Sequence, residues 1–331
     1  MSIAMTGHLG IKQEASFGVE ATPPTVFGEF KSESMAMDNN LIMPDYIGGT
    51  VGRKRILPGP ISNEGDLVFD LMPEDLMGWV LKGIFGQVST TSPVAGVYQH
   101  VFTPRSGLTL PSFTVQTDRE AGCENHIGTR FGSFNLGISP EELLECSVGM
   151  ISQYPKEATP ASPTYSTLDP WTAFDASVTF NSVLNTDFET IDFAISNDLQ
   201  AVPTLNNQRY AGKVSVLAFD VSGNMTLEFD SMDLVRRMWG NSVATQPQNC
   251  LTGNDLTITI TSQCQEIGST GYYYAITFEF FDIFISTAPH NLSGAKDRIM
   301  IDVAWTARYS AADANVMRVT LQNSQTGYPD P

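Results

Sequence analysis

The sequence has little positive charge and few cysteines, and each shortage narrows the functions to expect. Its 331 residues include 18 lysines and arginines against 36 aspartates and glutamates, which gives a formal net charge of −18 at pH 7. Affinity for a nucleic-acid backbone comes largely from lysine and arginine side chains that displace counterions, so specific binding of nucleic acid is not expected. The four cysteines include no C-x-x-C pair, which argues against a disulfide framework or a zinc site; they are Cys123, Cys146, Cys250 and Cys264.

Motifs for catalysis are missing as well. None of the four histidines lies in a G-x-S-x-G or H-E-x-x-H context; they are His8, His100, His126 and His290. Cys123, Glu124 and His126 could be a fragment of a metal site, but no second ligand pair has metal-site spacing, which favours a polar loop between strands. The sequence therefore predicts no catalytic, cofactor-binding or metal-binding residues and no cofactor. An enzyme on a β scaffold stays as the weakest alternative.

No secretory signal or membrane span is evident from the sequence. The first 18 residues have neither a cationic stretch nor a continuous apolar stretch, so we expect a protein that is made and kept in a cytoplasm. The most apolar window, residues 272–288, is short and contains Glu279 and Asp282, which argues against a bilayer span. Charged residues make up only 16% of the chain, against about a quarter in most soluble proteins. Extensive coverage of the surface by other protein is therefore expected.

Alternation of apolar and polar residues recurs along the chain and predicts a mainly β protein. The alternation is clearest over residues 67–71, 144–150, 256–260 and 299–307. Such segments are typical of strands with one face in the core and the other face in solvent. Cys146 falls on the apolar face of the second segment, so we expect it to be a core thiol.

One β-bulge and two short helices interrupt this pattern. Apolar residues alternate up to Phe280 and change phase at Phe281, which one inserted residue, a β-bulge, would cause. The segment "MPEDLMGWVLKGIFG" has a proline near its start, early acidic residues and a closing Gly86, and it predicts one short amphipathic helix. The segment "SMDLVRRMWG", closed by Gly240, predicts a second.

The sequence repeats itself at an offset of about 158 residues. The segment "EGDLVFDL" has its counterpart in "SGNMTLEF", and "FKSESMAMDNNL" has its counterpart in "FETIDFAISNDL". The aligned blocks are 63–86 with 221–240, 30–41 with 188–199 and, at an offset of 157, 144–151 with 301–308. A shared offset over three separate blocks indicates two tandem copies of one β-rich fold.

Composition between the aligned blocks predicts the domain boundary. Residues 152–170 contain four prolines and many serines and threonines, the composition of an extended linker. We therefore expect a first module with an N-terminal arm at 1–151 and a diverged second module at 171–331. The first module has a long loop at 44–62, and the second has the shorter "VPTLNNQRYAGKVSVLAFD" in that place.

The ordered set of segments resembles a known family. The segments "GVEATPPTVFGEFKSESMAMD", a loop rich in glycine and arginine, "EGDLVFDLMPEDLMGWVLKGIFG", "YQHVFTP" and "LPSFTVQTDR" follow one another as in the tail tube proteins (major tail proteins) of bacteriophages with long, non-contractile tails. The resemblance covers most of residues 14–155, and the second half resembles the same module in degraded form. It implies a structural virion protein with tandem β-sandwich or barrel modules that join between chains into a large closed β-barrel.

The resemblance also implies an assembly and its partners. Rings of the chain would stack into the tail tube, the conduit for DNA ejection into the host, and would be assembled in the host cytoplasm without membrane contact. Tail terminator, tail tip and tape-measure proteins would be the other partners, and double-stranded DNA would pass through without specific binding. Because one-module relatives close a ring with six chains, a trimer with pseudo-six-fold symmetry is favoured over a hexamer.

Two local features leave alternatives open. Arg53, Lys54 and Arg55 form the only run of three bases in this acidic protein, and they belong either to a solvated loop or to an inter-ring contact with acidic surface on another copy. The alternative function is a carbohydrate-binding or adhesin-type β-sandwich module of a virion. The aromatic residues 272–274 would be its candidate site, although they also fit the start of a strand.

Overall fold

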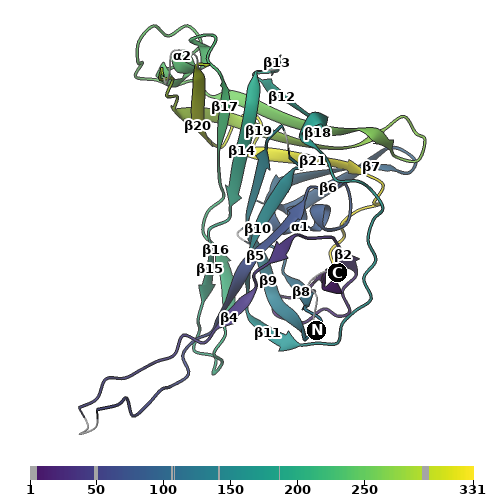
Figure 1. The fold of residues 1–331 in the computed structure, drawn as a ribbon, viewed down its shortest axis with the longest axis vertical. Helices are drawn as coiled ribbons and strands as arrows, with labels where there is room; N and C mark the ends of the chain where they lie inside the picture. The colour runs from purple at the N-terminus through teal and green to yellow at the C-terminus, as the bar shows by residue number, and fades with distance from the viewer. Residues whose placement is uncertain are drawn as a thin grey trace.

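The chain is mainly β, as predicted. The computed structural model describes residues 6–47, 51–105, 107, 109–140, 142–185, 187–292 and 298–331. In this part of the chain, 19 strands join into one hydrogen-bonded network and two more form a separate hairpin. The described residues contain two short α-helices, and the strands surround the first of them (Figure 1).

Eight strands form a long sheet that runs through both halves of the chain. The neighbours are all antiparallel and follow the order β4–β5–β10–β9–β14–β17–β20–β19, with β3 continuing the β4 edge. The two halves meet where β9 pairs with β14, from Ile138↔Ile191 to Ser133↔Ser196. The strands are β3 (Ser32–Glu33), β4 (Ala36–Asp38), β5 (Ser62–Asp70), β9 (Cys123–Ile138), β10 (Glu145–Ser152), β14 (Phe188–Ser196), β17 (Asp220–Glu228), β19 (Tyr273–Thr287) and β20 (Met300–Ala307).

Two further sheets share strands with the long sheet. The N-terminal sheet has the order β2–β1–β8–β9–β11, and the crossing sheet has the order β6–β7–β21–β19–β18–β12–β13. In Figure 1 the crossing sheet runs across the upper end of the long sheet. The strands are β1 (His8–Gln13), β2 (Val26–Phe27), β6 (Gly86–Val94), β7 (Val97–Pro104), β8 (Phe113–Asp118), β11 (Tyr154–Glu157), β12 (Ala176–Phe180), β13 (Val183–Asn185), β18 (Asn254–Glu266) and β21 (Met317–Asn323).

The strands β9 and β19 each belong to two sheets because each contains bulges. An extra residue enters β9 at Gly128, with φ 69°, and β19 at Asp282, with φ 52°. A second extra residue follows at Gly132 in β9 and at Ser286 in β19. Bulges bend a strand and increase its twist, so both strands pass from one sheet into the next. The bulge predicted at Phe281 is confirmed, one position along.

The two halves pair their strands in the same order. The first half has the order β2–β1–β8–β9–β10–β5–β4, and the second half has the order β13–β12–β18–β19–β20–β17–β14. The offset of 158 holds in the register as well, since Ala36↔Glu64 corresponds to Ala194↔Ser222. The β6–β7 hairpin belongs to the first half and pairs with β21 of the second.

Strand pairing revises one part of the sequence alignment. Val148 of β10 lies opposite Leu67, and Val303 of β20 lies opposite Met225, so β10 and β20 correspond at an offset of 155, not the predicted 157. The two alignments differ by two residues, and side chains along a strand also alternate with a period of two. Apolar alternation is therefore the same in both alignments and could not distinguish them.

Both predicted helices are present, but only one is enclosed. Helix α1 (Leu76–Phe85) ends at Gly86, whose φ of 73° lies in the left-handed region that favours glycine, and α2 (Asp233–Trp239) ends at Gly240. Nine of the ten residues of α1 are buried, so α1 is not amphipathic as predicted. It packs against β6, β7 and β9, and Tyr328 of the C-terminal tail covers Gly78. In α2 only Val235 is buried.

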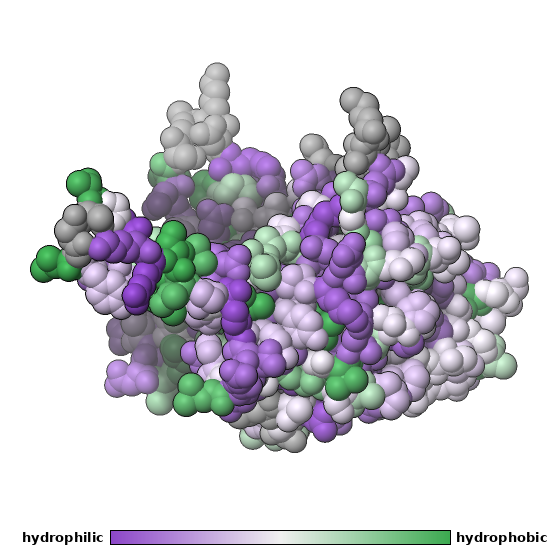
Figure 2. Space-filling model, turned by 90° about the horizontal axis from the view of Figure 1, so that it is seen from below, coloured by the Kyte–Doolittle hydropathy of each residue, from purple (hydrophilic) through white to green (hydrophobic). Residues whose placement is uncertain are grey.

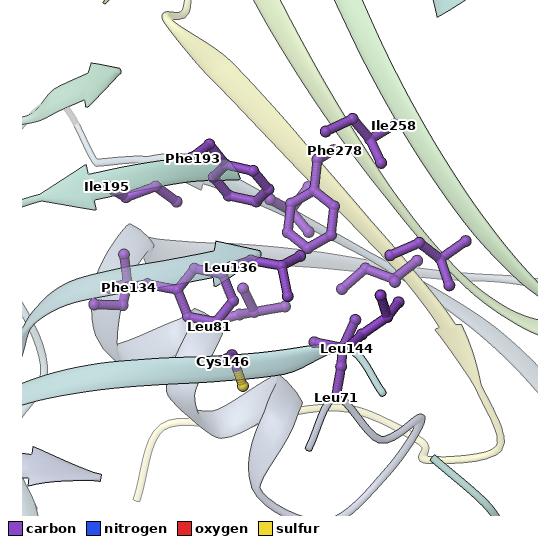
Figure 3. Close-up of a cluster of buried hydrophobic side chains, with 14 of the residues drawn as sticks. Leu71, Leu81, Phe134, Leu136, Leu144, Cys146, Phe193, Ile195, Ile258 and Phe278 are labelled. Carbon is purple, nitrogen blue, oxygen red and sulfur yellow. The ribbon is translucent and has the colours of Figure 1, made fainter. Parts of the chain in front are cut away.

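Side chains of both halves build one core (Figure 3). Phe193 of β14 lies with its ring centroid 6.2 Å from Phe134 of β9 and 5.0 Å from Phe278 of β19. Cys146 is fully buried beside Leu136 and is a core thiol, as predicted. Each large apolar side chain buried in this way stabilises the fold by roughly 1.5–3 kcal/mol, so the contact between halves contributes substantially to stability.

The N-terminal segment and the linker contain more regular structure than predicted. In place of an arm, β1 pairs with β8 and puts Leu9 and Ile11 in the core. Five of its six residues are buried, so both faces are covered and the alternation typical of a half-exposed strand is lost. Within the predicted linker at 152–170, Ser152 still belongs to β10, β11 pairs with β9, and residues 158–170 have no regular strand or helix.

Candidate functional site

One face of the long sheet is exposed and acidic. In β5, Leu67 and Phe69 point into the core, so Glu64 and Asp66 point to the other side. The exposed acidic residues that share this side, from all the long-sheet strands, are Asp38, Glu64, Asp66, Glu145, Asp192, Asp220, Glu228 and Asp302. The described strands β4, β5, β10, β14, β17 and β20 contain no lysine or arginine. The face therefore presents negative charge with no cation on these strands to offset it.

Neutral donors hold several of these carboxylates in place. Asn224 Nδ2 donates to Asp192 Oδ1 at 2.9 Å, and Thr226 Oγ1 donates to Asp302 Oδ1 at 2.9 Å. These hydrogen bonds leave the negative charge in place. A face of this kind repels phosphate, because binding to DNA needs cations that displace its counterions.

Cations gather at one end of the sheet. Lys31 Nζ lies 2.7 Å from Asp70 Oδ1 and 2.8 Å from Glu145 Oε2, and hydrogen bonds to these carboxylates raise the pKa of Lys31. At the corresponding end of the second half, Arg298 forms an ion pair with Glu189. These pairs neutralise the end of the sheet and leave the acidic centre unchanged.

The connection between β4 and β5, residues 39–61, projects from the body as an arm (Figure 1). Among its described residues the two sides are bridged at Ile42 and Leu57. Ile47 and Val51 near the tip are fully exposed, at 109% and 110%. Figure 2 shows apolar side chains on the projection at the left of that view, beside charged ones. Exposed apolar side chains of this extent mark surfaces that other protein covers.

The predicted contact residues Arg53, Lys54 and Arg55 are all exposed on this arm. Arg53 Nη2 lies 4.0 Å from Asp45 Oδ1, and the Arg55 guanidinium lies 6.0 Å from the centroid of the Tyr46 ring. Exposed ion pairs and cation–π contacts contribute at most about 1 kcal/mol each. The structure thus brings the three bases together at a surface where their charge faces outward.

The matching connection of the second half, residues 197–219, folds back onto the body. It contains 23 residues, as the arm does, so it is not shorter as predicted. It forms the hairpin of β15 (Leu199–Val202) and β16 (Lys213–Val216). Gln153 Nε2 donates to the Ala211 carbonyl at 2.9 Å, and Arg209 Nε donates to the Gly59 carbonyl at the base of the arm at 2.8 Å. The hairpin therefore packs on the first half and braces the arm.

Cys123 and His126 lie in strand β9, not in the predicted loop, and both are buried. His126 Nδ1 accepts from Asn63 Nδ2 at 3.1 Å, and its Nε2 donates to Thr117 Oγ1 at 2.8 Å. Burial lowers the pKa of His126 to about 4 and raises the pKa of Cys123 to about 11. Both ring nitrogens are used within the fold, and the described residues include no group of three or more His, Cys, Asp or Glu that could hold a metal ion.

A groove of about 770 Å³ lies between the β3 edge and the N-terminal sheet. Arg119 crosses it and donates to both carboxylate oxygens of Glu33, at 2.6 and 2.9 Å, and to Glu124 at 2.8 Å. Hydrogen bonds to Glu33 raise the pKa of Arg119. Carboxylates of the same chain therefore neutralise this cation, which leaves it unavailable to an anionic substrate.

The aromatic residues 272–274 do not form an aromatic platform. They lie at the start of β19, where Tyr274 is buried and Tyr272 and Tyr273 are only partly exposed. A sugar-binding site needs aromatic faces open to the ligand. The strand interpretation of these residues is the one that the structure supports.

Sequence reasoning did not identify the residues of the acidic face, and it missed the Glu33–Arg119 contact. The acidic face had a signal, since Glu64 and Asp66 alternate with apolar residues, but tertiary structure decides which faces of adjacent strands are aligned. Glu33 and Arg119 are 86 positions apart, and no local pattern connects them.

The comparisons with known proteins agree with this architecture. Helices in the described part of the chain are too short to cross a membrane. A comparison with curated proteins finds no match. The family model described as phage tail tube protein matches residues 6–307, which include both halves. The chain therefore belongs to the phage tail tube protein family and is a structural component of the virion tail.

Proposed function

We propose that three copies of this chain close a ring and that stacked rings form the tube through which DNA leaves the virion. The observation that supports this proposal is the long sheet, in which strands of both halves run side by side with one exposed acidic face. A wide sheet with two open edges is prone to pair with other chains. Closure into a barrel removes those edges.

The chain, in this proposal, carries two copies of one β-rich module at 1–151 and 171–331, joined by the linker at 152–170. Two observations support the duplication: the identical strand order of the halves and the matched pairs of bulges in β9 and β19. Each module contributes four strands to the long sheet. Three chains would then supply six modules and a pseudo-six-fold barrel of 24 strands, eight from each chain.

The acidic face would line the bore, and its role would be to let DNA slide. Double-stranded DNA is repelled by carboxylates and finds no lysine or arginine on the central strands to bind. The role is structural rather than catalytic. Assembly would take place in the host cytoplasm, and the ends of the tube would contact tail terminator, tail tip and tape-measure proteins.

The arm would reach a neighbouring ring. Its exposed apolar tip needs a protein surface to cover it, and Arg53, Lys54 and Arg55 are suited to the acidic surface of another copy. Contacts between rings of this kind would fix the stacking of the tube.

Electron microscopy of the purified protein, followed by symmetry analysis of the images, tests the proposal. The expected result is tubes or rings with three chains per ring and a bore lined by the acidic face. Six identical chains per ring would contradict the trimer, and a neutral or basic bore would contradict the role of the acidic face. Dispersed monomers with affinity for glycans would contradict the tube and favour an adhesin-type module.

A further inference from the structure

The long sheet ends in two edges that have no strand partner among the described residues. At one edge lie residues 33–38, from the end of β3 to the end of β4. At the other lie Thr287, the last residue of β19, and residues 288–292, which follow it without regular structure. Each of these edge segments has a counterpart in the opposite half of the chain, and the two counterparts pair with each other at the internal junction between β9 and β14. Residues 33–38 correspond to 191–196 at an offset of 158, and residues 287–292 correspond to 133–138 at an offset of 154.

We propose that residues 33–38 of one copy pair with residues 287–292 of the next copy in the register of the internal junction. Phe193↔Leu136 in that junction corresponds to Met35↔His290 between copies. This inference rests on the proposed ring, because it names the edges that close it. The occupant of each edge is a second copy, since both strands of the internal pairing have their counterparts on this chain.

Backbone direction at the first edge fits this register. Ser34 N–H donates to the Asp66 carbonyl of β5 at 3.0 Å. In an antiparallel strand the backbone groups of successive residues point to opposite sides, so the N–H and C=O of Met35 point away from β5. They point to the open side, where only side chains of the same chain contact them among the described residues.

Backbone direction at the second edge fits as well. Asp302 N–H of β20 donates to the Pro289 carbonyl at 3.4 Å, so the backbone groups of Ala288 and His290 point away from β20. Proline has no N–H to donate and is tolerated only where a ladder hydrogen bond is not needed. At Pro289 the missing donor faces β20, and the open side keeps its full set of donors and acceptors.

Side chains of the same chain cover both edges in the free protein. Met35 N–H donates to Glu33 Oε2 at 3.1 Å, and the Met35 carbonyl accepts from Arg119 Nη2 at 3.0 Å. At the other edge, His290 Nδ1 donates to the Ala288 carbonyl at 2.9 Å. Such covers protect open edges from indiscriminate pairing. Ring closure would exchange these side-chain contacts for backbone ladder bonds to the next copy.

Burial at the internal junction predicts what the next copy would cover. Ile195 and Ile138 are buried there, whereas their counterparts Met37 and Leu292 are 45% and 82% exposed. The apolar character of both positions is kept, but only the internal pair has a partner strand within the chain.

Asn39 supports the same register independently, because its counterpart in the second half makes hydrogen bonds across the internal junction. Its counterpart Asn197 is almost fully buried at the internal junction, where its N–H donates to the Gly132 carbonyl at 2.8 Å and its Nδ2 donates to the Ile84 carbonyl at 3.0 Å. Asn39 itself is exposed. In the proposed register its N–H would reach the carbonyl of Ser286, the counterpart of Gly132, on the next copy. Its Nδ2 would reach the carbonyl of Ile285, the counterpart of Phe131, to which Asn197 Nδ2 donates at 3.4 Å.

Disulfide cross-linking in assembled tubes tests the register. Cysteines replace Asp38 and Thr287, the counterparts of Ser196 and Ser133, in a background with C250S and C264S. Neighbouring Cα atoms of such a non-hydrogen-bonded pair lie about 4.5 Å apart, within disulfide range. Mixing chains that carry D38C alone with chains that carry T287C alone should give a covalent dimer on non-reducing gels. S133C with S196C should give an intrachain disulfide and serves as the positive control.

A cysteine pair shifted by two residues distinguishes a wrong register from a wrong proposed function. The pair D38C with P289C lies two residues out of register and should cross-link much less than D38C with T287C. If the two pairs cross-link equally well in intact tubes, the register is wrong but the proposed tube is still supported. If the wild-type protein forms no rings and no interchain cysteine pair cross-links, both the proposed function and the proposed register are wrong.

The asparagine variants give a readout without cysteines. N197A should lower the melting temperature of the free chain, because it removes a buried side-chain hydrogen bond. N39A removes only the exposed hydrogen bond from Arg209 Nη2 to Asn39 Oδ1 in the free chain, so it should lower the melting temperature much less. It should raise the critical concentration for tube formation roughly tenfold, the effect of one lost buried hydrogen bond from Nδ2 to the next copy. Equal melting temperatures and equal assembly of N39A and wild type would overturn the proposed contact of Asn39.

Discussion

The arm and the β15–β16 hairpin occupy the same place in the two halves, and their difference shows how the chain divides its contacts. Each connects the same pair of strands with 23 residues. The hairpin buries Val214 and Val216, while Ile47 and Val51 of the arm are fully exposed. Length therefore does not decide whether such a connection folds back. The available surface does.

The hairpin finds its surface on the first half of its own chain. Tyr210 stacks on Tyr154 of β11 with ring centroids 4.6 Å apart, and Arg130 donates to the Val214 carbonyl. Beyond β4 the first half has no such neighbour among the described residues, so the arm finds no equivalent surface there. Its apolar side chains are left for another copy, and this is the difference that the following predictions test.

Shortening the two connections should separate stability from assembly. Replacing residues 43–56 of the arm by a short Gly-Asn turn should leave the free energy of unfolding unchanged, because almost no buried contact is lost, but should abolish tube formation. Replacing residues 203–212 of the hairpin should instead destabilise the chain, because the contacts of Arg209 and Ala211 are lost. Thermal unfolding and electron microscopy of both variants measure the two effects. Equal destabilisation by both changes would break the comparison.

The helices of the two halves give the next largest effect. Lys82 of α1 is buried, and its Nζ donates to the Tyr328 and Pro329 carbonyls at 2.9 Å and lies 2.8 Å from Asp330 Oδ1. Removing residues 328–331 would leave this charge with Gln13 as its remaining hydrogen-bond partner and with the ring of Trp79, 5.5 Å away. Loss of the partners of a buried charge costs about 3–5 kcal/mol. Denaturant unfolding of the truncated chain should show a loss of this size.

K82M in the truncated chain is the matched control. It removes the charge whose desolvation causes the loss, so it should recover part of the stability. Helix α2 has no C-terminal tail upon it and only one buried residue, so R236M on α2 should change stability little. A truncated chain as stable as the full chain would refute the role given to the tail.

The sequence predicted the parts of this fold that depend on nearby residues. Alternation located β5, β10, β18 and β20, the closing glycines located the ends of α1 and α2, and a change of phase located the bulge of β19. The pairing of β9 with β14 and of β7 with β21 was not foreseen, because it joins segments that lie more than 50 and more than 200 positions apart. The two-residue shift between β10 and β20 was hidden because the shifted strand keeps its alternation.

The candidate surfaces were predicted to a similar degree. The basic cluster of the arm could be found from composition alone, because three bases in a row are rare in this chain. The covers on the sheet edges could not, because Arg119 approaches Met35 only after β8 and β9 are in place. Exposed edges are a property of tertiary structure, and sequence patterns report only the strands that form them.

His126 makes the first half sensitive to acid in a way that the second half is not. Its counterpart at an offset of 154 is Phe280, and its partners Asn63 and Thr117 correspond to Val221 and Ile258. Burial holds the pKa of His126 at about 4, below the ordinary 6.5. The unfolded chain therefore takes up a proton below pH 6.5 that the native chain does not. Stability is fully present above pH 6.5 and is lost as the pH falls toward 4.

The loss should reach roughly 3 kcal/mol at pH 4, since each pH unit between the two pKa values corresponds to about 1.4 kcal/mol. The triple variant N63V/T117I/H126F carries the apolar residues of the second half and should lose this pH dependence. The three changes replace His126 together with both side chains that bond its ring. Ser152 Oγ, which accepts from Asn63 Nδ2 at 2.7 Å, still has the backbone carbonyl of residue 63 as its partner at 3.2 Å, so no buried group is left without a partner. Urea unfolding between pH 7 and pH 4 measures both proteins, and equal slopes would refute the assignment to His126.

Removing the basic cluster of the arm should have the smallest effect on assembly, and no equivalent change on the hairpin should affect assembly. Replacing Arg53, Lys54 and Arg55 by alanine should leave the melting temperature unchanged, because all three are exposed and their contacts within the chain are weak. Exposed ion pairs contribute about 0.2–1 kcal/mol each, so losing three across a ring contact should raise the critical concentration for tubes roughly tenfold. Salt screens such pairs, so wild-type assembly should weaken with added salt and the variant should respond less. K213A on the hairpin is the control, because Lys213 is exposed on the connection that already packs within its chain. If K213A impairs assembly as much as the arm variant, net charge rather than the arm governs stacking, and the division of contacts between the two connections is wrong.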